Sequence, residues 1–105
     1  MREKLEAALA ATGYVFAHHG WSKAPEGSYG VWAEESGEDF IANGRHVERG
    51  TRVAIDLFTR DDTHAPRDAV EAQLNALGWP WRLDAVQYEN ETGLIHWLWV
   101  VGCYG

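Results

Sequence analysis

The chain has few of the features that would assign it to a common functional class. It contains a single cysteine, Cys103, which cannot form an internal disulfide and therefore fits a reducing compartment. No apolar run approaches the roughly 20 residues that a membrane-spanning helix needs. The N-terminal Met1-Arg2-Glu3-Lys4 leads into a charged helix rather than a signal sequence. We therefore expect a cytosolic protein without a membrane partner.

Basic residues are also scarce. Nine Lys and Arg stand against 16 Asp and Glu, which gives a formal net charge of −7. A field of this sign repels phosphate groups, so nucleic-acid binding, sequence-specific binding included, is disfavoured. No glycine-rich phosphate loop is present, because the glycines are scattered and no Gly-Lys-Ser/Thr sequence occurs. These absences exclude a nucleoside triphosphatase.

Aromatic residues, in contrast, are abundant: six Trp, four Tyr and three Phe among 105 residues. Each buries roughly 150–250 Å² of surface, so a few of them must dominate the core of so short a chain. The length predicts one domain spanning residues 1–105. So heavy an aromatic content in a small domain also predicts that some of these side chains are buried against a partner.

Hydrophobic periodicity predicts two helices. The first covers Arg2 to Ala11 and ends before Gly13. The second covers Ala65 to Leu77, with Pro66 suited to the first turn and Gly78 at the C′ position. Its apolar face carries residues at i, i+4 and i+7, namely Val70, Leu74 and Leu77.

Alternating apolar residues predict the strands. Ser28 to Glu34 and Asp39 to Ala42 indicate a hairpin, and Arg52 to Arg60 indicates a central strand with Ile55 and Leu57 buried. Trp81 to Glu89 and Leu94 to Val101 indicate a closing hairpin, whereas Tyr14 to Gly27 shows no period and is expected to be a connection. The predicted class is α+β. We expect a mostly antiparallel sheet with two helices packed on one face, in the order α-β-β-β-α-β-β.

The closing hairpin is expected to have two apolar faces. An even-length turn pairs Glu89 with Leu94, and therefore Asp84 with Trp99. One face then carries Val86, Tyr88, Ile95, Trp97, Trp99 and Val101, and the other carries Trp81, Leu83, Ala85, Leu98 and Val100. Helices on one side cover only that side, so the second face must meet an extra strand layer, the 14–27 segment or another subunit. We favour another subunit, with a candidate interface formed by Trp81, Leu83, Leu98 and Val100.

Residues that could carry chemistry are few. Asp61, Asp62 and His64 follow a strand end, where general acid/base residues often lie, but we favour a turn formed by Asp61, Asp62 and Thr63 before the second helix. The adjacent His18 and His19 suggest a metal, yet neighbouring side chains are expected to diverge and no further ligand recurs at a suitable spacing. Cys103 is expected to be an inert thiol in a C-terminal tail. We therefore predict no catalytic residue, no metal and no cofactor.

Arg45, Arg49 and Arg52 form the one basic concentration in the chain. A solvated loop, partly neutralised by Glu48, accounts for them. Contact with a negative partner surface, or with DNA that passes nearby, is the functional alternative.

The second half of the chain resembles the tail terminator, or tail completion, proteins of long-tailed bacteriophages and their prophages. The resemblance rests on Val53 to Arg60, on the helix end Leu74 to Leu77, and on the hairpin stretches Val86 to Glu89 and Glu91 to Trp97. Members of this family assemble as rings, commonly hexameric, that stop growth of the tail tube and support joining to the head.

The resemblance implies a structural, non-catalytic role for this chain. Its implied partners are further copies of itself, the tail-tube protein and a head-tail connector protein. Its implied location is the virion tail, and the host bacterial cytoplasm during assembly. The resemblance also implies that the arginine segment faces the ring lumen or an axial neighbour. A small acidic protein-binding or inhibitor module is the alternative function, and an enzyme built on Asp61, Asp62 and His64 is a third.

Overall fold

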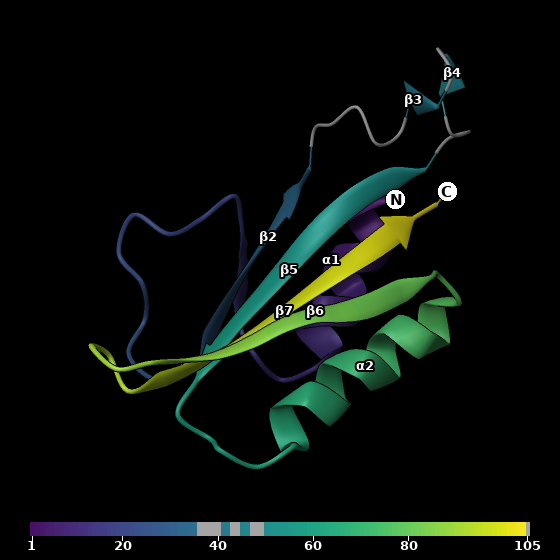
Figure 1. Cartoon of the computed structure of the whole chain (residues 1–105). Coiled ribbons are helices and arrows are strands. Elements are labelled where there is room, and N and C mark those ends of the chain that lie inside the picture. The colour runs from purple at the N-terminus through teal and green to yellow at the C-terminus, as the bar shows by residue number, and fades with distance from the viewer. Residues whose placement is uncertain (36–40, 43–44, 47–49, 105) are drawn as a thin grey trace.

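The centre of the fold is a five-stranded sheet that carries both helices on one face (Figure 1). The computed structural model describes residues 1–35, 41–42, 45–46 and 50–104. Its elements are α1 (Arg2–Ala11), β1 (Phe16–His18), β2 (Tyr29–Glu34), β3 (Ile41–Ala42), β4 (Arg45–His46), β5 (Thr51–Thr59), α2 (Ala65–Leu77), β6 (Trp81–Glu89) and β7 (Leu94–Cys103). Among the described strands, the sheet order is β1-β2-β5-β7-β6, in which only β1 and β2 are parallel, and β3 and β4 form a separate two-stranded ribbon. The predicted α+β class is confirmed.

Helix α2 has the bounds that its sequence predicts. Pro66 lies in the first turn, where its missing N–H costs no hydrogen bond. Gly78 takes a left-handed conformation with φ 74°, and its N–H donates to the carbonyl of Asn75 at 3.0 Å. Val70 and Leu74 are fully buried, as predicted. Local signals therefore determine this helix.

Strand β5 is the third of the five strands, which confirms its predicted central position. It pairs antiparallel with β2 on one side and with β7 on the other. Alternate residues Val53, Ile55 and Leu57 are fully buried beneath the helices. The residues between them lie on the opposite face and are partly exposed.

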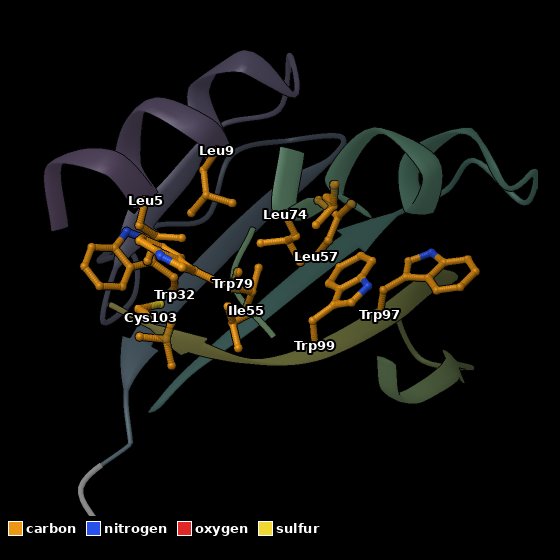
Figure 2. Packing of buried hydrophobic residues seen from close by; sticks show 13 residues of the cluster. Leu5, Leu9, Trp32, Ile55, Leu57, Leu74, Trp79, Trp97, Trp99 and Cys103 are labelled. Carbon is orange, nitrogen blue, oxygen red and sulfur yellow. The ribbon is translucent and has the colours of Figure 1, made fainter. Parts of the chain in front are cut away.

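The core lies between the helices and one face of the sheet (Figure 2). Leu5 and Leu9 of α1 meet Trp32 of β2, and Leu74 of α2 lies over the central strands. Two tryptophans also bind α2 by polar contacts that the sequence did not predict. Trp99 Nε1 donates to Glu71 Oε2 at 3.0 Å, and Trp81 Nε1 donates to Asn75 Oδ1 at 2.9 Å.

The segment predicted as a connection from Tyr14 to Gly27 contains a short strand. In β1, Phe16 pairs with Gly30 of β2, and its ring lies directly over that glycine. A Cβ at Gly30 would lie 2.2 Å from the Phe16 ring, so only glycine fits there. The prediction was wrong because three residues are too few to show a period.

The predicted hairpin between Ser28–Glu34 and Asp39–Ala42 is also wrong where the structure describes it. Strand β2 pairs with β1 and β5, whereas Ile41–Ala42 pairs with Arg45–His46. Residues 36–40, including the predicted turn, lie outside the described part of the chain. The prediction paired β2 with the next strand segment in the sequence. Its antiparallel partner is instead β5, which follows the β3–β4 ribbon.

The register of the closing hairpin agrees with the prediction near its turn and differs beyond it. Glu89 pairs with Leu94 and Val86 with Trp97, as predicted. A bulge between Leu83 and Ala85 then leaves Asp84 as an extra residue, so Leu83, not Asp84, pairs with Trp99. This one-residue shift moves Trp81 and Leu83 to the helix side of the sheet, where both pack against the core.

Candidate functional site

Neither helix covers the second face of the sheet, which we call the open face (Figures 1 and 2). The register places alternate residues of β2, β5 and β7 side by side on it. Its apolar members are Val31, Ala33, Ala54, Phe58, Leu98 and Val100. Five of these side chains are partly exposed, and the sixth, Val100, is buried with 8% of its surface exposed. A face of this kind, built on rigid strands, is suited to binding another protein surface.

An aromatic row crosses the open face at one end. The rings of Tyr29 and Phe58 stack at 5.0 Å between centroids, and Phe58 stacks on His96 at 4.3 Å. The His96 Nε2 lies 2.6 Å from Asp56 Oδ1, so the imidazole hydrogen-bonds a carboxylate on the neighbouring strand. Residue spacing does not reveal this group, because only the pairing of β2, β5 and β7 brings its members together.

The four residues predicted as a subunit interface do not share one face. Leu98 and Val100 lie on the open face, whereas the β-bulge places Trp81 and Leu83 on the helix side. Trp81 is further held there by its hydrogen bond to Asn75. The predicted set is therefore divided, and only Leu98 and Val100 remain together.

The arginine segment is also divided. Arg52 lies within β5 rather than on a loop, and its Nε lies 2.8 Å from Glu35 Oε1. Arg45 belongs to β4, while Arg49 and Glu48 lie outside the described residues. An ion pair on the sheet thus accounts for the charge of Arg52. The expectation that the segment contacts a ring lumen or an axial neighbour stays a prediction.

Asp61 and Thr63 are joined in the turn predicted for Asp61, Asp62 and Thr63, and His64 lies directly before α2. Asp61 Oδ1 accepts hydrogen bonds from the Thr63 backbone N–H at 2.9 Å and from the Thr63 hydroxyl at 2.6 Å. These bonds hold the pKa of the Asp61 carboxyl below its ordinary value. All three predicted residues are exposed, so the structure places no enclosed reaction site around them.

His18 and His19 do not diverge, contrary to the sequence-based expectation. Their rings stack at 3.9 Å between centroids, and the His18 ring stacks on Trp32 at 3.9 Å. Glu34 of the neighbouring strand joins them: its Oε1 lies 2.7 Å from His18 Nε2 and 3.8 Å from His19 Nε2. We call these three residues, His18, His19 and Glu34, the histidine cluster. The hydrogen bond from His18 is the main reason that the pKa of the Glu34 carboxyl lies below its ordinary 4.5.

Glu34→Gln should change how stability depends on pH in acid. Because the folded-state pKa of Glu34 is lowered, its ionised form stabilises the fold above pH 4.5, and this contribution disappears as the pH falls through the folded pKa. Urea unfolding with a chelator present should show a difference between wild type and variant at about pH 5 that is smaller at a pH well below 4.5. Solvent screening keeps the effect small, because 35% of the side chain is exposed. An equal difference at both pH values would contradict the prediction.

Cys103 is a buried residue of β7, not part of a tail as predicted. Burial raises the pKa of its thiol to about 12. The thiol is therefore protonated at neutral pH, and a protonated thiol is a poor nucleophile.

No helix in the described ranges combines the length and apolarity needed to span a bilayer. Comparisons of the chain with protein-family models, with curated proteins and with solved structures gave no match.

Proposed function

We propose that the chain is a ring-forming structural protein of a long-tailed bacteriophage or prophage, a tail terminator or tail completion protein. The observation that carries the proposal is the open face, where apolar side chains of three adjacent strands lie without a covering helix. Burial of such a face against a neighbouring subunit is favourable, because it removes apolar surface from water. The sequence resemblance supplies the specific role.

A ring also needs a second, different surface on each subunit, since its contacts are heterologous. The end of the β6–β7 hairpin offers one. Val86 and Tyr88 are 47% and 63% exposed there, beyond the part of the sheet that the helices cover. We propose that this hairpin end of one subunit packs against the open face of the next, centred on Leu98.

The charge of the chain predicts how assembly depends on salt. Each copy carries −7, so copies repel one another at low ionic strength. Salt screens this repulsion over about 10 Å at 0.1 M. We propose that a finished tail tube acts as a template that overcomes the remaining repulsion, and that a head-tail connector protein binds the completed ring.

Light scattering over a series of protein and salt concentrations tests the proposal, together with pull-down on purified tail tubes. We expect the mass to rise with both concentrations, or the protein to be retained on the tubes. A strict monomer that also ignores the tubes would overturn the proposal, and would favour a small acidic module that binds a basic partner.

A further inference from the structure

The histidine cluster brings three potential metal ligands together at the edge of the sheet. His18 ends β1 and pairs with Trp32 of β2, and Glu34 follows two residues later on the same face of β2. His19 comes directly after β1. One nitrogen from each imidazole and one carboxylate oxygen all lie within 4.8 Å of one another.

The backbone at His19 is the reason that both imidazoles lie on one side. Successive residues of an extended strand point to opposite faces. His19, however, has φ 72°, the only positive φ at a non-glycine residue in the described part of the chain. Its N–H donates to the carbonyl of Trp32 at 2.8 Å, which fixes this conformation. Backbone strain of this kind is concentrated at functional sites, where the surrounding structure must maintain it.

The spacing of the cluster suits a small divalent ion. In a tetrahedral zinc site, ligands about 2.0–2.1 Å from the metal lie about 3.3 Å from each other. The two distances from Glu34 Oε1, 2.7 Å to His18 Nε2 and 3.8 Å to His19 Nε2, lie on either side of that value. To bind one ion, the first contact must open, the second must close, and the stacked His18 and His19 rings must tilt apart so that both nitrogens face the metal.

We propose that His18, His19 and Glu34 form a binding site for a divalent transition-metal ion of the Zn²⁺ class. Two imidazoles and one carboxylate are a ligand set that zinc accepts, and three protein ligands leave a fourth position for water or an external ligand. The site is open to solvent on one side, because 69% of the His19 side chain is exposed. On the other side it is rigid, because His18 rests on the buried Trp32 ring. A bound ion would tie β1 to β2.

The chain contains a matched control for this proposal. His96 and Asp56 also join an imidazole to a carboxylate across neighbouring strands, at 2.6 Å. In the described part of the chain, no third His, Cys, Asp or Glu completes a ligand group around them. A simple His–carboxylate pair should not hold zinc firmly, whereas the histidine cluster should.

Titration calorimetry with Zn²⁺ tests the proposal, using untagged protein that has been freed of metal with a chelator. We expect one Zn²⁺ per chain and a raised melting temperature in its presence. His19→Ala and Glu34→Gln should each weaken binding by at least about tenfold. The melting temperature without metal checks that each variant is folded, which matters for His19→Ala because residue 19 has a left-handed backbone conformation.

His96→Ala should bind Zn²⁺ as tightly as the unmodified protein. Absence of Zn²⁺ binding by the unmodified protein would overturn the proposal. Binding by His19→Ala and Glu34→Gln that is as tight as binding by the unmodified protein would also overturn it. A loss in His96→Ala as large as the loss in His19→Ala, with both variants folded, would likewise overturn it.

Discussion

Leu74→Ala is expected to lower the free energy of unfolding by about 2–5 kcal/mol. Leu74 lies at the middle of the apolar face of α2, is fully buried, and contributes to the core beneath both helices. The substitution removes apolar contacts and leaves a cavity that the rigid sheet beneath it cannot fill. Urea unfolding followed by circular dichroism measures the change. A domain of 105 residues has a small core, so this loss is a large part of its total stability.

Val86→Ala is the comparison for this change. It also shortens an aliphatic side chain, but at a position that is 47% exposed near the hairpin end. We expect it to cost less than about 1 kcal/mol, as most surface substitutions do. If Leu74→Ala cost less than about half a kilocalorie per mole, Leu74 would not be a core residue and α2 would not pack on the sheet through this side chain.

Leu98→Glu is expected to weaken the proposed self-association while leaving the subunit folded. Leu98 lies in the middle of the open face, paired with Asp56 on one side and Ala85 on the other, and its side chain is partly exposed. A carboxylate there stays hydrated in the monomer but would be buried unpaired in a contact between subunits. Because every joint of a ring is identical, one substitution damages all of them.

We expect the association constant for each joint to fall at least about tenfold, a change of about 1.4 kcal/mol. Light scattering at high salt and retention on tail tubes measure the fall. Ala72→Glu adds the same charge on the exposed surface of α2 and should associate like the unmodified chain. Association of Leu98→Glu equal to that of Ala72→Glu would show that the open face is not the assembly surface.

The sequence by itself determined those elements whose signals are local. Helix α2 was predicted with its bounds, because Pro66 and the apolar stripe lie within its 13 residues and Gly78 follows its last residue directly. The central strand β5 followed from its strict alternation, and the hairpin register near Glu89 and Leu94 followed from the length of the turn. In each case the deciding residues are neighbours in the chain, so the pattern can be read without knowing the fold.

Only the tertiary structure decided the features that depend on distant residues. The bulge at Asp84 is a feature of the pairing of β6 with β7, and it divided the predicted interface by placing Trp81 and Leu83 on the helix side. The histidine cluster depends on the parallel pairing of β1 with β2 and on the left-handed conformation of His19. Neither can be read from residue spacing, because packing and strand pairing between distant segments override local preference.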